Sequence, residues 1–477
     1  MGDQIAEESV LSPLSRDDIE EIHSASLKIL EEVGIKIFDE ESLRLLDEAG
    51  ADVDYRVKTS RIPSALTSEM IRKAPRRYML FGREREFDLR VGGGETYFAT
   101  GNAADIVEDR GSRRIKREDL AVYIRLADVL GNVHFCVGTS VADVPQAIWD
   151  IYQFDIMVNN TVKNLRPVIA SGRGAEIILK MACAVVGDDE ALMKKPILHF
   201  GYSVTSPLQW GTTALQVFRE TSRYNIPVDI VSEPMSGGTS PVTLAGTIAL
   251  ANAEVLSGIV LNQLYRRGRP CTYSIGFAHT MDLKSAQPLS AGPEQGLIAA
   301  AGAQMAHYYS LPSQSWIGSD SKLVDVQLAY EKTLGIMLHL LSGNDKIWGV
   351  GSLDLEFSIS LEQAVIDNEI IDMVTRLKRG ITVNEETLAL DVIKRVDIGG
   401  MFLKEKHSRD HYLQEHVQAK IIDHYSRRKW ERMGSKDMVM RAKERVDELV
   451  KSHESKPLDR DIRKNLKEII KQAKKGL

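Results

Sequence analysis

The chain has 477 residues, with 61 Lys and Arg against 67 Asp and Glu, which gives a formal net charge of −6. This near balance argues against a nucleic-acid-binding or membrane-surface protein, and no stretch approaches the ~18 uninterrupted apolar residues of a membrane span. Three cysteines lie far apart in apolar surroundings, at Cys136, Cys183 and Cys271. They indicate reduced thiols in the cytoplasm rather than disulfides or a zinc site, and the acidic N-terminus lacks the apolar core of a signal peptide.

Residues 1–94 predict a mixed α+β section that packs on the part of the chain that follows. Ser15 and Asp18 resemble a helix-capping pair, apolar residues recur at helical spacing after them, and Gly34 is placed to end that helix. The sequence then predicts strands at 35–38, 78–81 and 87–91 and helices at 40–49 and 64–74.

Between residues 95 and 384, short apolar strands alternate with helical patterns. The predicted strands are 97–100, 133–139, 167–171, 197–202, 228–232, 271–275, 313–317 and 347–351. The predicted helices are 117–130, 146–164, 175–186, 209–224, 241–267, 294–309, 324–342 and 361–379. Eight of each predict an α/β fold of the (β/α)8 TIM barrel type. A doubly wound open sheet is the alternative, but it usually has fewer strands, and no GxGxxG follows the first strand.

Residues 385–477 predict a helical C-terminal extension, because the composition there becomes polar and charged. Helices are expected at 410–430 and 438–452, and a last one after Pro457.

In a TIM barrel the chemistry lies at the carboxyl ends of the strands. The sequence shows no metal-ligand pattern there and no obvious lysine for a Schiff base. Aromatic residues gather instead, and aromatic faces beside a carboxylate suit a quaternary ammonium ion, with plain barrel packing as the alternative. Glu233 is the most suggestive acid, since an unpaired charge in a barrel mouth is costly, although a salt bridge would also explain it. His279 could orient a carboxylate or be a structural histidine. The aromatic residues are Tyr97, Phe98, Tyr202, Phe277, Trp316, Trp348 and Phe357.

The stretch 229–277 reads as one strand–loop–helix–strand unit. Its loop, Ser236-Gly237-Gly238-Thr239, precedes a helix in the manner of an anion-binding turn. The loop follows the fifth strand, whereas phosphate sites in barrels usually follow the seventh and eighth, which argues against a phosphate site.

Several motifs resemble those of the trimethylamine methyltransferase family over nearly the whole chain. They are 236–247 with 250–256, Asp320-Ser-Lys with 327–332, 360–367, and His407-Ser-Arg-Asp-His411 with Tyr425 and Trp430. The resemblance implies a TIM barrel that moves a methyl group from an amine to the cobalt of a separate corrinoid protein. It also implies that cobalamin is carried by that partner, that no cofactor is tightly bound to this chain, and that the protein is a homo-oligomer.

Family members that act on trimethylamine carry pyrrolysine in the region of the seventh strand, near 316–320 here. This chain has ordinary residues there, so it resembles the non-pyrrolysine branch. That branch implies a quaternary amine as substrate, such as glycine betaine, proline betaine, carnitine or γ-butyrobetaine.

The resemblance gives each candidate residue an expected role. Glu233 and Asp320 balance the cation. The substrate-binding candidates are Trp316, Trp348, Phe357 and Tyr97 as an aromatic cage, Gln314 as a hydrogen-bonding partner, and Asn102 and His279 for the substrate carboxylate. Two alternatives stay open at this point: a barrel hydrolase or lyase that uses Glu233, His279 and Asp320 as acid–base groups, and a non-catalytic betaine-binding subunit.

Overall fold

The computed structural model describes residues 11–475, and its first element is a capped helix. Helix α1 (Arg16–Lys28) begins after Ser15, whose side chain accepts a hydrogen bond from the Asp18 N–H while the Asp18 carboxylate accepts one from the Ser15 N–H. The π-helical turn η1 (Ile29–Val33) follows and ends at Gly34, whose φ of 82° suits glycine. The predicted cap and stop are confirmed. The expected lack of a signal peptide concerns residues 1–10, which lie outside the described residues.

The rest of the N-terminal section packs against the barrel. Strand β1 (Ile35–Ile37) pairs in parallel with β12 (Gln209–Trp210), a short strand inserted in the barrel. Helices α1 and α3 (Ser64–Lys73) pack on the barrel helix α9 (Leu244–Tyr265). The elements are β1 (Ile35–Ile37), α2 (Glu40–Glu48), β2 (Asp52–Asp54), β3 (Thr59–Arg61), α3 (Ser64–Lys73), β4 (Tyr78–Leu80), η2 (Arg85–Phe87) and β5 (Leu89–Val91).

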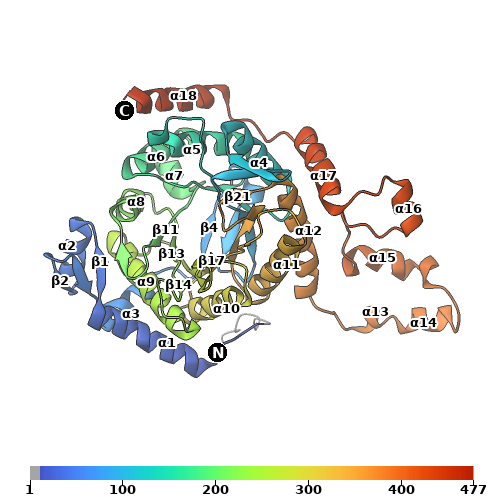
Figure 1. The fold of residues 1–477 in the computed structure, drawn as a ribbon, viewed down its shortest axis with the longest axis horizontal. Coiled ribbons are helices and arrows are strands. Elements are labelled where there is room, and N and C mark those ends of the chain that lie inside the picture. Colours follow the sequence, from blue (N-terminus) through green and yellow to red (C-terminus); the bar gives the residue numbers. More distant parts are fainter. Residues whose placement is uncertain (1–10, 476–477) are drawn as a thin grey trace.

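Eight parallel strands form a barrel that is ringed by helices (Figure 1). In spatial order they are β10-β9-β6-β19-β18-β15-β13-β11, and an isolated bridge joins Leu165 of β10 to Leu198, two residues before β11. The TIM barrel prediction is therefore confirmed. The strands are β6 (Tyr97–Thr100), β9 (Phe135–Val137), β10 (Asn164–Arg166), β11 (Phe200–Val204), β13 (Val228–Ser232), β15 (Cys271–Gly276), β18 (Ser313–Trp316) and β19 (Lys346–Val350).

The predicted position of the third strand is wrong. It was expected at 167–171, but β10 ends at Arg166 and residues 167–171 lead into α6. The apolar run after Arg166 has the pattern of a buried strand, whereas the strand itself carries polar side chains at Asn164 and Arg166 that point into a polar barrel interior.

The helices between the strands agree with the prediction to within a few residues. Helix α9 has the length and hydropathy of a membrane span, but 83% of its most apolar window is buried inside the protein, as in a core helix. The helices are α4 (Arg117–Val129), η3 (Gln146–Ile148), α5 (Trp149–Asn160), α6 (Gly172–Val186), α7 (Asp189–Lys194), α8 (Thr212–Ser222), α9 (Leu244–Tyr265), α10 (Pro293–Tyr308), α11 (Val326–Leu341) and α12 (Leu361–Lys378).

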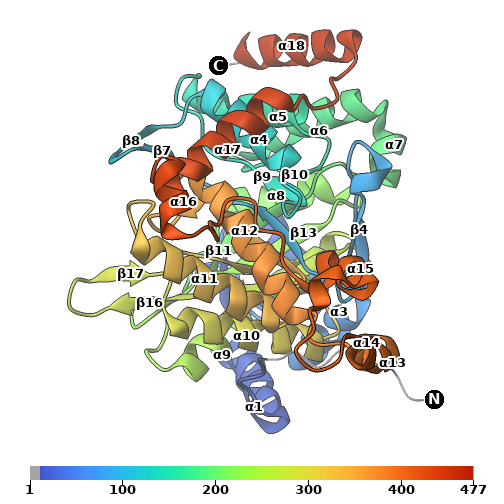
Figure 2. The same cartoon turned by 90° about the vertical axis from the view of Figure 1, so that its right-hand side faces the viewer.

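The two ends of the barrel differ. The β4–β5 hairpin closes the amino end, where Tyr78 Oη lies 2.6 Å from Thr272 Oγ1 of β15. Hairpins that follow the strands surround the carboxyl end, which we call the mouth; in Figure 2 the β7–β8 and β16–β17 hairpins point to the left and β4 lies at the right. The mouth strands are β7 (Asp105–Glu108), β8 (Gly111–Arg114), β14 (Met235–Ser236), β16 (His279–Asp282), β17 (Gln287–Leu289), β20 (Ser352–Leu353) and β21 (Ser358–Ile359).

The C-terminal extension first leaves the barrel and then returns to it. Helix α17 packs on α12 and α4, and α18 packs on α6 and α5. The single helix expected at 410–430 is wrong, since residues 416–426 separate two shorter helices. The elements are α13 (Glu385–Leu388), α14 (Leu390–Val396), η4 (Phe402–Lys404), α15 (Lys406–Glu415), α16 (Arg427–Arg432), α17 (Met438–Ser452) and α18 (Arg460–Lys475).

Candidate active site

A fully buried aspartate lies inside the barrel, near the start of its strand. The Asp229 carboxylate on β13 forms ion pairs with Lys346 Nζ of β19 and, at 3.0 Å, with Arg166 Nε of β10. Burial would raise the pKa of Asp229, but these cations, Lys346 foremost, outweigh burial and hold the pKa well below its usual range. His199 Nε2 lies 3.4 Å from the same carboxylate, and burial followed by the Lys346 charge lowers the pKa of His199 to about 4, so its ring is neutral at pH 7. Lys346 and Arg166 are thus two cations on one ionised aspartate, and Asp345 and Glu356 also act on them.

Arg166 connects this charged cluster to the aromatic residues nearer the mouth. Its Cζ atom lies 3.9 Å from the centroid of a Trp348 ring, the geometry of a cation–π contact. Gly201, on the neighbouring strand β11, provides the space, because a Cβ atom there would collide with Arg166 Nη2. The Asp229 ion pair and the Trp348 ring therefore hold the guanidinium in place.

Two tryptophans and a glutamine present polar groups that have no partner among the described residues. Trp316 and Trp348 are register neighbours on β18 and β19, and the Phe277 ring meets Trp348 edge-on at a centroid distance of 5.0 Å. Both indole N–H groups and both side-chain polar atoms of Gln314 are buried without a hydrogen bond. Gln314 lies two residues before Trp316 and so faces the same side of β18. Unpaired buried polar groups are costly, so this arrangement favours a site for a bound molecule.

Glu233 lies nearer the mouth than the Asp229 cluster. It is four residues beyond Asp229 on the same strand path, which places its backbone ~13 Å farther along at ~3.3 Å per residue. Protein surrounds its carboxylate, and the loss of hydration raises the pKa of Glu233 to about 7. Part of its surface stays accessible, as expected of a side chain that faces the mouth.

The turn between β20 and β21 contains three consecutive non-glycine residues in a left-handed conformation. The φ angles are 54° at Asp354, 55° at Leu355 and 64° at Glu356. Each such residue costs ~1–3 kcal/mol. The backbone N–H groups of Asp354 and Leu355 donate to the carbonyls of Ser321 and Ser319, at 2.9 and 2.8 Å, and so hold the turn against the loop that follows β18.

This turn brings a second carboxylate to the mouth. Burial, followed by the charge of Glu233, raises the pKa of Glu356 well above its usual range, and the charges of Arg166 and Lys332 oppose that rise. Glu356 Oε1 is buried and has no hydrogen-bond partner among the described residues. Strained backbone and carboxylates with raised pKa values occur together at functional sites.

The motif residues of the sequence hold the loops that carry these groups. Glu254 of α9 accepts hydrogen bonds from Ser232 Oγ at 2.6 Å, next to Glu233, and from the Leu208 N–H at 2.8 Å. Lys332 of α11 is fully buried, and its Nζ donates to the Gly349 carbonyl at 2.6 Å, where β19 ends. These are positioning residues rather than groups that face the mouth.

Two predicted cage residues differ from the tryptophans in their surroundings, although Tyr97 belongs to the same buried cluster as Trp316 and Trp348. Tyr97 starts β6 at the amino end of the barrel, and its hydroxyl donates to Glu95 Oε2 at 3.1 Å. The Phe357 side chain is 60% exposed. We therefore do not include Tyr97 and Phe357 in the cage proposed below.

Three other predicted residues lie among the mouth loops. Asn102 follows β6 and is partly buried. His279 begins β16, with Nδ1 3.3 Å from the Phe277 carbonyl oxygen, and burial lowers its pKa. Asp320 Oδ1 accepts hydrogen bonds from the backbone N–H and the hydroxyl of Ser290, at 2.8 and 3.0 Å, so one of its oxygens anchors a loop.

The sequence reasoning missed Arg166, Asp229 and Glu356. The first two had a signal, because a charged residue inside a buried strand needs a partner. Asp229 lies within a strand that was predicted correctly. Arg166 lies just outside the predicted third strand, 167–171, although it is the last residue of β10. Glu356 had no signal, because no glycine marks its left-handed turn.

The described residues include no group of three or more His, Cys, Asp and Glu side chains arranged to hold a metal ion. The site instead offers the cations that pair with Asp229, the Trp348 ring against Arg166, and the carboxyl groups of Glu233 and Glu356. Such an arrangement can bind and orient a molecule that carries an anion at one end and a cation at the other.

Comparison with known proteins gives a match over the whole chain. The family model described as trimethylamine methyltransferase matches residues 3–477. A trimethylamine methyltransferase of Methanosarcina barkeri is 36% identical over 476 residues, which cover 98% of this chain and 96% of that protein. A glycine betaine methyltransferase of Desulfitobacterium hafniense is 30% identical over 471 residues, which cover 97% of each.

A solved structure supports the fold. The monomethylamine methyltransferase of Methanosarcina barkeri superposes with a TM-score of 0.58 at 10% sequence identity and covers 94% of this chain and 89% of that one. At this identity the likeness concerns the fold alone.

Proposed function

The chain belongs to the trimethylamine methyltransferase family, and on that premise we propose that it demethylates a quaternary amine, glycine betaine or a related betaine. It is a corrinoid-dependent methyltransferase, and the proposed acceptor is the Co(I) of a corrinoid carried by a separate cytoplasmic protein. Family membership argues against both alternatives, a barrel hydrolase or lyase and a non-catalytic betaine-binding subunit.

The order of charges along the barrel axis is the observation that carries the proposal. Two cations, Lys346 and Arg166, pair with one aspartate inside the barrel, and Glu233 and Glu356 place carboxylates at the mouth. A betaine has a carboxylate at one end and a quaternary nitrogen at the other. The carboxylate of a bound betaine would lie toward Arg166 and its methyl groups toward the mouth. An amine without a carboxylate would form no ion pair with Arg166.

Carboxylates and aromatic rings would bind the cationic end of the substrate. A quaternary nitrogen has no N–H to donate, so it is bound by aromatic faces and by unpaired negative charge. Trp316 and Trp348 supply the rings, and Glu233 supplies a charge that is present in part at pH 7, because its pKa is raised to about 7. Asp320 stays a candidate for the same role through its second oxygen.

Hydrogen-bond donors that are already held in place in the free protein would bind the carboxylate of the substrate. Arg166 is held by Asp229 and by the Trp348 ring, and Gln314 adds an amide whose atoms are unpaired. His279 and Asn102 stay candidates for a longer substrate whose carboxylate reaches the mouth loops. Groups fixed in advance lower the entropic cost of alignment.

The residues of this chain bind, align and shield rather than exchange protons. A reduced corrinoid supplies the electron pair that accepts the methyl group, while the C–N bond breaks with its electrons left on nitrogen. The leaving amine is neutral, so no general acid is required. Binding between Arg166 and Glu233 would direct one methyl group out of the mouth, and the aromatic rings would exclude water.

The rim of the mouth fits a partner that covers it. Val242 and Leu283 are 64% and 68% exposed on the loops after β14 and β16, and Val326 and Tyr330 are 82% and 61% exposed at the start of α11. Exposed apolar side chains grouped at one end are typical of a docking surface, so we propose that the corrinoid protein binds there.

A methyl-transfer assay tests the proposal. Cobalamin absorbance would be followed with reduced corrinoid protein and a panel of betaines, with trimethylamine as a negative control. We expect demethylation of at least one betaine and none of trimethylamine. Turnover of trimethylamine alone would refute the proposed substrate class, and no methyl transfer from any member of the panel would refute the function.

A further inference from the structure

A hollow at the amino end of the barrel lies between the N-terminal section and the barrel itself. Residues of α1 and α3 line one side of it and the end of α10 lines the other, and we call it the α3 hollow. In Figure 2, α3 and β4 lie at the right and the mouth hairpins lie at the left. Its volume of about 510 Å³ is within the ~300–1,000 Å³ of small-molecule sites, which often lie between structural units.

The α3 hollow contains positive charge without negative charge. Arg72, in the last turn of α3, and Arg76, just before β4, both line it, and the described residues that line it include no Asp or Glu. Neither arginine forms an ion pair within the described part of the chain, and both are exposed. The neighbouring Glu69 is engaged by Lys73, whose Nζ lies 2.5 Å from Glu69 Oε1. Two guanidinium groups are therefore available to one anion.

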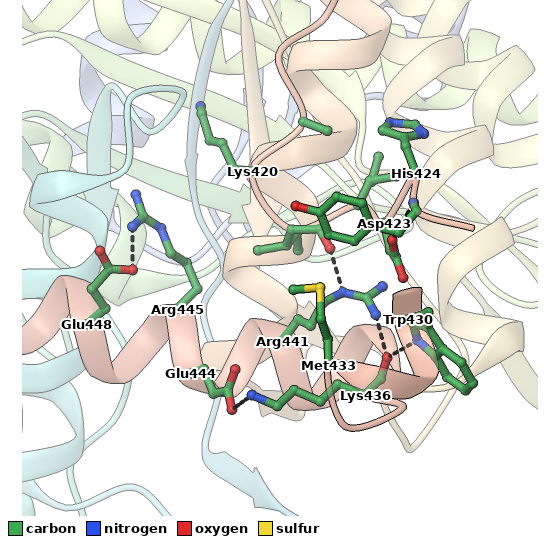
Figure 3. A pocket seen from close by; sticks show the side chains of 14 residues that line it. Lys420, Asp423, His424, Trp430, Met433, Lys436, Arg441, Glu444, Arg445 and Glu448 are labelled. Carbon is green, nitrogen blue, oxygen red and sulfur yellow. Dashed lines mark hydrogen bonds and ion pairs between the residues drawn. The ribbon is translucent and has the colours of Figure 1, made fainter. Parts of the chain in front are cut away.

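A hollow of similar size on the C-terminal extension shows the opposite pattern. It has a volume of about 490 Å³ and lies between the 419–425 loop, α16 and α17 (Figure 3). Arg445 Nη1 lies 2.6 Å from Glu448 Oε2, and Lys436 pairs with Glu444. These cations are neutralised by acids of the same hollow, so they offer little to an anion, whereas the arginines of the α3 hollow are not neutralised.

Three aromatic rings form the other wall of the α3 hollow. The His23 ring centroid lies 5.5 Å from those of Tyr308 and Tyr309, and the two tyrosine centroids lie 5.2 Å apart. Tyr309 Oη lies 2.9 Å from His23 Nδ1 and accepts a hydrogen bond from Asn252 of α9 at 2.9 Å, which holds these two rings in place. Burial lowers the pKa of His23, so its ring is neutral at pH 7. Tyr308 is 43% exposed, so part of its ring surface is open to a planar group.

We propose that the α3 hollow binds a mononucleotide, with its phosphate between Arg72 and Arg76 and its base stacked on Tyr308. The planar fork of arginine matches two phosphate oxygens at once, and every base has a face that stacks on an aromatic side chain. Inorganic phosphate would leave the ring uncovered, and a nucleoside would leave the arginines unpaired. The bound nucleotide would contact α1, α3 and the end of α10, and so link the N-terminal section to the barrel. The inference does not depend on the methyl donor.

Isothermal titration calorimetry of the full-length chain with AMP, adenosine and inorganic phosphate tests this site. AMP should bind more tightly than either of its parts, because it alone meets both the arginines and the ring. Arg76→Gln should weaken AMP binding by ~10-fold or more, since it removes a charged hydrogen-bond donor. Tyr308→Leu should weaken the binding of AMP and adenosine and leave that of inorganic phosphate unchanged. Arg56→Gln, at an exposed arginine between β2 and β3, is the matched control and should bind AMP like the wild type.

Thermal melts give a second readout that separates lost binding from lost folding. A ligand that binds the folded state raises the melting temperature, so AMP should raise it in the wild type and in Arg56→Gln and much less in Arg76→Gln. Without AMP, Arg76→Gln should melt like the wild type, because Arg76 has no ion pair within residues 11–475. Three results would overturn the proposal: no AMP binding at millimolar concentrations, equal affinities for AMP and inorganic phosphate, or equal losses of affinity in Arg76→Gln and Arg56→Gln.

Discussion

Replacing Arg166 with glutamine should impair recognition of the substrate carboxylate more than it impairs the fold. Asp229 keeps its ion pair with Lys346 in the variant, so no buried charge is left alone. A hydrogen bond to a charged group contributes ~1.5–3 kcal/mol, which corresponds to a ~10- to 150-fold rise in KM for glycine betaine at ~1.4 kcal/mol per tenfold.

The comparison that isolates this effect uses two substrates. Tetramethylammonium has the same cationic head but no carboxylate, so the inner cation can only repel it, and its KM should stay unchanged or fall in Arg166→Gln. Initial rates with both substrates and reduced corrinoid protein give the ratio of the two KM values. Arg266→Gln is the matched control, because Arg266 donates to backbone carbonyls at 2.7 and 3.2 Å beside α8. If Arg166→Gln raises both KM values equally, the carboxylate does not face Arg166.

Three further predictions concern the mouth. Because the pKa of Glu233 is about 7, kcat/KM for a betaine should rise with pH through 7 as the carboxylate ionises, and Glu233→Gln should flatten that profile; an unchanged profile in the variant would refute the role of Glu233 in binding the cation. The same raised pKa means that the stability of the fold falls as pH rises from ~4.5 toward 7, and thermal melts should show a weaker fall in the variant. Trp348→Ala and Trp316→Ala should each lower kcat/KM by ~10-fold or more, since cation–π contacts contribute ~2 kcal/mol when desolvated, with circular dichroism confirming the fold; unchanged kinetics in both would refute the cage. Leu355→Gly should relieve backbone strain and stabilise the protein by ~1 kcal/mol in urea melts; if this variant is less stable than the wild type, the turn is not strained. Glu356→Gln should keep the strain and lower the affinity for the cationic end of the substrate.

The architecture could be predicted because each strand and helix leaves a local pattern. The run of β-branched residues at 228–232 and the helical spacing after Ser15 depend only on neighbours in sequence, and both were located correctly. The third strand was misplaced because Asn164 and Arg166 interrupt the apolar pattern by which buried strands are recognised.

The site was harder to predict because its parts meet only through tertiary contacts. Trp316 and Trp348 could be named from strand parity and the family resemblance, but nothing local shows that Arg166 lies against Trp348. The left-handed turn at 354–356 depends on hydrogen bonds to the loop after β18, which a sequence pattern does not show.

The glycine beside Arg166 ties two positions of the chain to a common history. A side chain at residue 201 would occupy the space of the guanidinium, so Arg166 can arise only in a lineage that already has glycine there. A Cβ atom at residue 201 would also lie 2.7 Å from Asp229 Cβ, so the glycine is needed for the aspartate as well as for the arginine. A relative with a larger residue at this place should therefore have lost the whole ion pair, and with it the selection for a zwitterionic substrate.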